Sequence, residues 1–91
     1  MTSYVLMWGG GDLASGVALR LHRSKIRVLV VEISQPLAVR RSVSFAQAVY
    51  DAKTTIEGVT GQLIETPQEM EAVWKDGGVP VIVDPELNLL E

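Results

Sequence analysis

The apolar residues of this chain fall into short uninterrupted runs that alternate with segments of helical spacing. Residues 5–8 form one run and lead into three glycines, and residues 28–31 form a second run that ends at Glu32. The second run is typical of a strand buried on both faces of a parallel sheet, because it is apolar at nearly every position. Between the two runs, five apolar residues recur at helical spacing, which predicts one buried face of a helix. They are Leu13, Ala14, Val17, Ala18 and Leu21.

The middle of the chain is less regular. Pro36 could open a helix, but we expect an irregular, arginine-bearing loop over residues 36–43 and then a helix over residues 44–51. In this second helix, Ser44 and Gln47 have the spacing of a capping box. Residues 53–57 and 60–65 are typical of short strands separated by Gly58, which form either a hairpin or one bent strand.

The last third of the chain has the clearest helix boundaries. Thr66, Pro67 and Glu69 supply a cap, a proline at the first helical position and a glutamate three residues after the cap. The apolar face of this helix comes from Met70, Val73 and Trp74, and residues 76–78 end it with two glycines. Residues 79–84 then predict another buried strand, with Pro80 near its start.

The order of these elements predicts an α/β fold. Strands alternate with helices along most of the chain, which favours a Rossmann-like three-layer sandwich with a mainly parallel sheet. With 91 residues there is room for one sheet and a few helices. We therefore expect residues 1–91 to form a single domain.

The glycines after the first strand are the strongest candidate for a binding site. Gly9, Gly11 and Ala14 have the spacing of the dinucleotide-binding fingerprint, with Gly10 between the first two. Gly9 permits a tight turn, Gly11 leaves the backbone open to a phosphate, and the following helical N–H groups favour an anion. Glu32 lies about twenty residues further on, where the fingerprint places an acid that binds a ribose hydroxyl. The alternative is a glycine turn that only reverses the chain.

Three charged residues near this turn each have two interpretations. Asp12 either caps the first helix or holds a hydroxyl, an amine or a metal-bridged phosphate. Arg40 and Arg41 are either solvated surface or a pair that holds a phosphate through charge-assisted hydrogen bonds. Both interpretations stay open at this stage.

The sequence offers little for catalysis or metal binding. A metal site would depend on Asp12, Glu32 and Asp84, which could suit Mg²⁺ but have no recognisable ligand spacing. His22, the single histidine, is expected on the surface, and there is no cysteine. We therefore predict no catalytic residues and no metal, and a chain that binds rather than catalyses.

Composition narrows the class of partner. A hydrophobic fraction of 47% is that of a folded globular domain, and a net charge of −3 argues against a nucleic-acid surface. The absence of cysteine fits a reducing cytoplasm. No apolar run approaches the length of a membrane span, and the first residues do not form a secretion signal. The prediction is a cytoplasmic protein that contacts neither nucleic acid nor membrane.

Four stretches of the chain carry a family resemblance. GGGDLASGVALRLHR, QPLAVRRSVSFAQAVYD, IEGVTG and VPVIVDPE resemble the N-terminal part of the YqeB-like accessory proteins of selenium-dependent molybdenum hydroxylases. The resemblance spans roughly residues 5–86. It departs at Ala52, where we expect a glycine, and in length, because family members carry a second glycine-rich region that this chain lacks.

The resemblance implies a function as well as a fold. It implies a Rossmann-like domain, similar in style to the XdhC-type proteins that help xanthine dehydrogenase mature and are thought to handle its molybdenum cofactor. The ligand would be an NAD-like dinucleotide or the nucleotide portion of a molybdopterin cofactor. The partners would be a molybdenum hydroxylase or other maturation factors. The alternative is a cofactor-binding fragment of a nicotinamide-dependent oxidoreductase. We also expect homo-oligomers, because leucines at positions 87, 89 and 90 are costly to expose.

Overall fold

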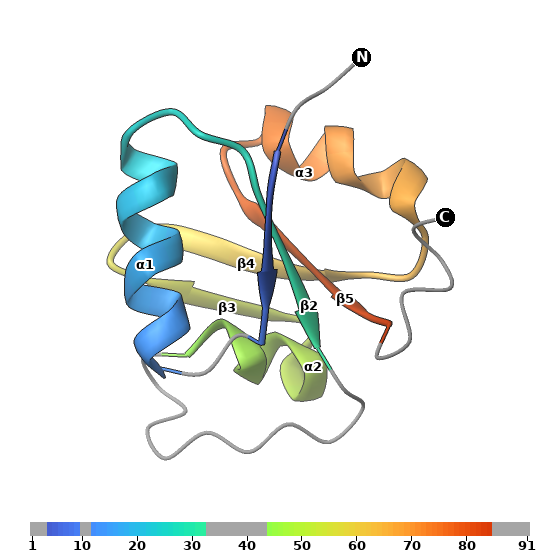
Figure 1. The fold of residues 1–91 in the computed structure, drawn as a ribbon. Helices are drawn as coiled ribbons and strands as arrows, with labels where there is room; N and C mark the ends of the chain where they lie inside the picture. The colour runs from blue at the N-terminus through green and yellow to red at the C-terminus, as the bar shows by residue number, and fades with distance from the viewer. Residues whose placement is uncertain (1–3, 10–11, 33–43, 85–91) are drawn as a thin grey trace.

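A computed structural model describes residues 4–9, 12–32 and 44–84, without the side chains of residues 12 and 13. Figure 1 shows its strands and helices. In chain order they are β1 (Val5–Trp8), α1 (Asp12–Arg23), β2 (Val28–Glu32), the 3₁₀ turn η2 (Phe45–Gln47), α2 (Ala48–Asp51), β3 (Lys53–Ile56), β4 (Val59–Ile64), the 3₁₀ turn η3 (Pro67–Glu69), α3 (Met70–Lys75) and β5 (Val79–Val83).

The described strands form one five-stranded sheet in the order β1-β2-β5-β4-β3. The pairs β1–β2, β2–β5 and β4–β5 are parallel, and β3 pairs antiparallel with β4. The predicted α/β fold with a mainly parallel sheet is therefore confirmed. The two short strands around Gly58 form a hairpin, and its turn residues Glu57 and Gly58 have φ values of 50° and 83°. Positive φ at both central residues is the type I′ geometry that matches the twist of the two strands.

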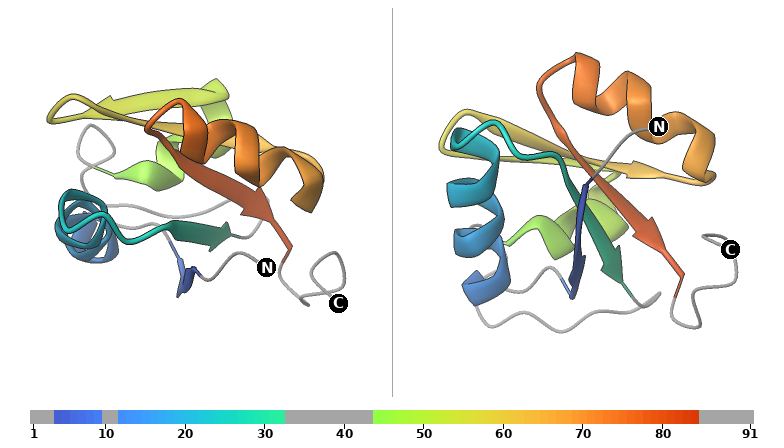
Figure 2. Two further views of the ribbon diagram at one scale, coloured as in Figure 1. Left: turned by 90° about the horizontal axis from the view of Figure 1, so that it is seen from above. Right: turned by 45° about the horizontal axis from the view of Figure 1, so that its top comes forward.

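Helices cover both faces of the sheet, as the two views of Figure 2 show. On one face, α1, η2 and α2 pack against Val28 and Val30 of β2 and Val79 and Val81 of β5. On the other face, α3 packs against the side chains that alternate with these, including Leu29, Val31 and Ile82. Because β2 is apolar at both sets of positions, all five of its residues are buried, which confirms it as an inner strand of a three-layer sandwich.

Strand β1 lies at an open edge of the sheet. Its side chains Val5, Leu6 and Trp8 are 37%, 39% and 59% exposed, so this apolar run is not buried as the run in β2 is. The local pattern of an edge strand and an inner strand can be the same, because burial depends on which strands lie beside it. In the doubly wound dinucleotide-binding fold the first strand is flanked on both sides, whereas here β1 pairs with β2 alone among the described strands.

Helix α1 presents part of the predicted face to the sheet. Ala18 is fully buried and Leu21 packs against the core, as predicted, whereas Val17 is 49% exposed and Ser15 and Leu19 are buried. Ser15 can face inward because its hydroxyl oxygen accepts a hydrogen bond from the backbone N–H of Phe45 at 2.7 Å. This bond joins α1 to the start of η2.

The second helical segment has nearly the predicted bounds but begins as a 3₁₀ turn. Ser44 caps it, with its hydroxyl oxygen accepting a hydrogen bond from the N–H of Ala46 at 3.1 Å. The predicted capping box with Gln47 is wrong, because the Gln47 amide donates to the Asp51 carboxylate at 2.8 Å. The segment begins as the 3₁₀ turn η2 and continues as the four-residue helix α2.

The helix after Thr66 follows its prediction closely. The Glu69 carboxylate accepts hydrogen bonds from the backbone N–H groups of Thr66 and Glu65, both at 2.8 Å, as in a capping box. These bonds, the one from Thr66 first, hold the pKa of Glu69 below its ordinary value, because they favour the charged carboxylate. The helix ends at Gly77, whose φ of 81° suits a glycine, and the N–H of Gly78 closes the turn on the carbonyl of Val73.

Candidate functional site

Three strands end side by side at the carboxyl edge of the parallel part of the sheet. The N–H of Gly9, directly after β1, donates to the carbonyl of Val31 at 2.8 Å. The N–H of Asp84, directly after β5, donates to the carbonyl of Glu32 at 3.0 Å. Gly9, Glu32 and Asp84 therefore occupy neighbouring strand ends in the order of β1, β2 and β5. Ligands of open α/β sheets bind outside this edge.

The backbone at Gly9 explains why a glycine stands there. Its φ is +89°, a conformation that side chains rarely adopt, while an added Cβ would meet no atom within 4 Å. The requirement is therefore conformational and not one of space: the chain must leave β1 sharply before α1 begins at Asp12. The predicted order of strand, glycine turn and helix is confirmed, and Ala14 lies half-buried in the first turns of α1.

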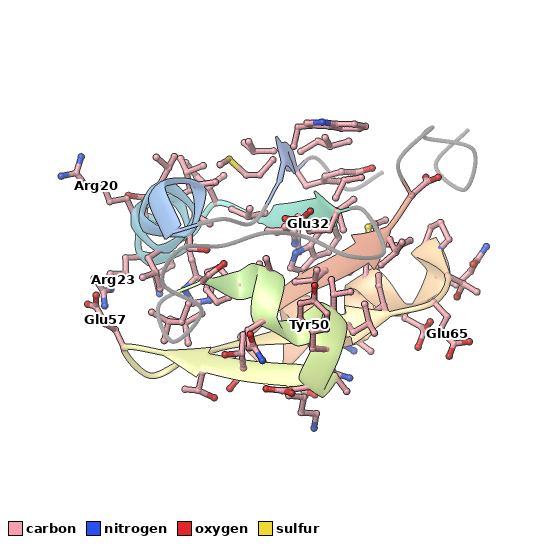
Figure 3. The ribbon with its side chains drawn as sticks, turned by 90° about the horizontal axis from the view of Figure 1, so that it is seen from below. Arg20, Arg23, Glu32, Tyr50, Glu57 and Glu65 are labelled. Atoms are coloured by element: carbon pink, nitrogen blue, oxygen red, sulfur yellow. The ribbon has the colours of Figure 1, made fainter. Side chains whose placement is uncertain are left out.

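Two carboxylates lie buried at this edge. Glu32 is 8% exposed and Asp84 is 4% exposed. Figure 3 shows Glu32 at the end of β2 in the middle of the carboxyl edge, away from Arg20, which points outward from α1. Buried acids are uncommon and need partners. Their burial distinguishes both residues from ordinary turn residues.

Several residues of the predicted site lie outside the described part of the chain. They are Gly10, Gly11, Arg40, Arg41 and the side chain of Asp12. The structure places Gly9, Ala14 and Glu32 around the carboxyl ends of β1 and β2, and Asp84 at the end of the neighbouring strand β5. The sequence had already named Glu32 and Asp84 together, because each follows an apolar run.

His22 makes a contact that the sequence did not predict. Its imidazole is half-buried at the surface, and its Nε2–H donates to the carbonyl of Gly77 at 2.8 Å. This bond ties the end of α1 to the turn before β5. Trp8, directly before the glycine turn, is mainly exposed. The type of a single residue does not indicate which distant segment its side chain will contact.

The described residues contain no group of three or more metal-ligating side chains. Glu32 and Asp84 alone provide fewer ligands than a dedicated cation site uses. Within the same residues, no helix has the length and apolarity to cross a membrane.

A comparison with known proteins was made for the whole chain. No family profile and no solved structure matches it. A match is found to a protein of Escherichia coli strain K12 named "Uncharacterized protein YqeB", with 44% identity over 87 residues. The aligned region is 96% of this chain and 16% of that protein, so the chain spans about one sixth of the relative's length. Over nearly its whole length, this chain is YqeB-like in sequence.

Proposed function

We propose that this chain is a nucleotide- or cofactor-binding module, and that the ligand lies over the carboxyl edge of β1 and β2. The observation that carries the proposal is the juxtaposition of Gly9, with its positive φ, and the buried carboxylate of Glu32 at the end of the adjacent parallel strand. This is the relative position of the phosphate-binding turn and the ribose-binding acid in dinucleotide-binding sheets.

Each residue has a defined task in this proposal. The first N–H groups of α1 carry the positive end of the helix dipole and would bind a phosphate, with Gly10 and Gly11 leaving room for it. Glu32 would accept hydrogen bonds from ribose hydroxyls. Arg40 and Arg41, which follow β2 in the sequence, would supply further charge for the phosphates.

The edge position of β1 counts against a full dinucleotide fold in this chain. In the described sheet, β1 has a neighbouring strand, β2, on one side only, so the glycine turn lies beside one strand end and not between two. A mononucleotide, or one half of a dinucleotide, is therefore the ligand that these residues suit best.

Thermal denaturation with NAD, NADP, FAD, ATP, GTP and CDP tests the proposal. A ligand at one hundred times its Kd adds about 2.7 kcal/mol to the free energy of unfolding, which raises the Tm of a domain of this size by on the order of 10 °C. Gly11→Val is expected to abolish the shift, because its side chain would occupy the phosphate position. Gly16→Val is the matched control, because the position is exposed and a Cβ there meets no atom within 4 Å. No Tm increase with any nucleotide at millimolar concentration would refute the proposal.

The negative charge of Glu32 predicts that the site distinguishes NAD from NADP. Its carboxylate would accept a hydrogen bond from a ribose 2′-hydroxyl and repel a 2′-phosphate, so NAD should bind more tightly than NADP. Glu32→Gln keeps the shape of the side chain and removes the charge, and it should narrow that difference. Tighter binding of NADP by the unaltered chain would mean that Glu32 does not face the ribose.

The wider role follows from sequence similarity alone. We propose that the module serves an accessory protein in the maturation of a molybdenum hydroxylase, since the sequence is YqeB-like and the residues of its first helix resemble that family. CDP in the screen represents the nucleotide portion of a molybdopterin cofactor. A Tm increase with CDP but not with NAD would support this role over a nicotinamide-dependent one.

A further inference from the structure

A second candidate site lies at the opposite end of the sheet from the glycine turn. A cavity of about 890 Å³ opens at the amino ends of β2, β4 and β5, next to Arg27, Val59 and Gly78. Its lining includes Arg23 and Lys75 at the C-terminal ends of α1 and α3, and both helix ends lie toward the top of Figure 1. Its volume falls within the range of small-molecule pockets.

The charge of the lining is opposite to that of the chain. Of the side chains that the structure describes, four of the six lysines and arginines line the cavity, against one of the eight acids, Glu71. The cations are Arg23, Lys25, Arg27 and Lys75. A concave site lined by one sign of charge concentrates ligands of the other sign.

Only one of these cations is held by an ion pair within the described chain. Arg23 binds the Glu57 carboxylate at 2.8 Å, with both side chains more than half exposed. Figure 3 shows the two side chains pointing toward one another. Lys25, Arg27 and Lys75 form no ion pair with a described residue, so their charge remains available to an anion.

A fixed aromatic ring forms one wall. The Nε1–H of Trp74 donates to the carbonyl of Val28 at 3.0 Å, and the ring of Tyr4 packs against the indole at a centroid distance of 5.3 Å. The guanidinium carbon of Arg27 lies 5.9 Å from the centroid of the indole. The indole is therefore held in place before a ligand arrives, which lowers the entropy cost of binding. The hydrogen bond from His22 to Gly77 fixes the adjoining turn in the same way.

Helix stabilisation explains part of this charge but not all of it. Cations at the last turn of a helix interact favourably with its dipole, which applies to Arg23 in α1 and Lys75 in α3. Arg27 lies four residues beyond the end of α1, directly before β2, and its guanidinium stays beside Trp74. Stabilising a helix end requires only charge, whereas a ligand site is served by charge and a fixed aromatic ring together.

We propose that this cavity binds an organic anion with a planar aromatic body. The ring of the ligand packs along Trp74, and its carboxylate or phosphate lies among Lys25, Arg27 and Lys75. The site is separate from the glycine turn, so it stands whether or not a nucleotide binds there.

Nuclear magnetic resonance with 2-naphthoate as the probe tests this site. The two indole N–H signals belong to Trp8 and Trp74 and are assigned with Trp8→Phe. Titration should shift the Trp74 signal to saturation with a Kd of about 1 mM, as expected for a small ligand. The signals of Trp8 and of the Gly9 and Glu32 amides should stay in place. Absence of saturation at concentrations on the order of ten times this Kd would overturn the proposal.

Charge-matched variants and a neutral analogue of the probe distinguish a specific anion site from non-specific electrostatic attraction. Lys25→Gln with Lys75→Gln should weaken binding about tenfold, while Arg20→Gln with Lys53→Gln, which removes the same charge outside the cavity, should change it less than about twofold. The neutral amide 2-naphthamide should bind about tenfold more weakly than the acid. Equal weakening by the two double variants, or equal affinity for the acid and the amide, would overturn the proposal. Melting curves confirm that each variant is folded.

Discussion

Gly61 is a position where one added carbon should have a large effect on stability. It lies in β4, paired with Thr54 of β3 on one side and Val79 of β5 on the other. A Cβ at this position would lie 2.5 Å from Cδ1 and 3.3 Å from Cε1 of the Phe45 ring. Phe45 is fully buried, and its N–H is bonded to Ser15, so the ring cannot retreat without moving η2 or α1.

The expected cost of Gly61→Ala follows from two opposing terms. Overpacking a buried contact costs about 1–3 kcal/mol. Replacing glycine by alanine within a strand returns roughly 0.5–1 kcal/mol, because the unfolded chain loses conformational freedom. The net loss of unfolding free energy should be about 1–2 kcal/mol, which lowers the Tm by roughly 5–10 °C in a domain of this size.

Gly16→Ala provides the matched control. Gly16 is exposed on α1, and a Cβ there meets no atom within 4 Å. The same substitution should therefore stabilise the chain by about 0.5–1 kcal/mol through helix propensity. Urea denaturation followed by circular dichroism measures both variants.

A double-mutant cycle identifies the cause of the loss at Gly61. Phe45→Leu removes the ring atoms that the new Cβ would meet, so Gly61→Ala should cost less in that background by about 1 kcal/mol or more. If Gly61→Ala is neutral, or if its cost is the same with Leu at position 45, the close packing of Phe45 on β4 is refuted.

Three further predictions concern single residues. Ala52 has a φ of 70° and a ψ of −35°, and its N–H and carbonyl are both hydrogen-bonded. Ala52→Gly should therefore relieve backbone strain and raise the unfolding free energy by about 0.5–1 kcal/mol. A lower unfolding free energy in urea denaturation would contradict this strain. Trp74→Phe removes the hydrogen bond to Val28 and weakens the contact with a cation, so it should cost about 1–2 kcal/mol, whereas Trp8→Phe at the exposed edge should cost less than about 0.5 kcal/mol. The pKa of Glu69 is lower in the folded chain than in the unfolded chain, so its contribution is complete above the unfolded pKa and is lost as the pH falls through the folded pKa. Urea melts of the unaltered chain and Glu69→Gln should therefore converge in acid and differ at neutral pH, and a constant difference would contradict this.

Local signals in the sequence predicted most of the elements. Thr66 and Glu69 at one end and Gly77 at the other define the third helix, because caps act through backbone groups only a few residues away. The turn at Gly9 and the acid at Glu32 were found for the same reason: each marks the end of its own strand.

Contacts between distant segments were not predictable from local patterns. The hydroxyl of Ser15 faces inward, where it accepts a hydrogen bond from the N–H of Phe45, thirty residues later in the chain. The burial of Asp84 depends on β5 lying next to β2, and the exposure of β1 depends on the strand order. Periodicity describes the faces of one element, and it does not say which neighbour will cover them.

The open edge of β1 has a consequence for amide hydrogen exchange. The N–H groups of Val5 and Gly9 point toward β2 and bond to the carbonyls of Arg27 and Val31. Since N–H direction alternates along a strand, those of Leu6 and Trp8 point away from the sheet and should exchange rapidly with solvent. Any polypeptide that pairs with this edge would slow exchange at these two amides while leaving Met7 between them unchanged. Two amides can thus report whether the sheet continues into a further strand.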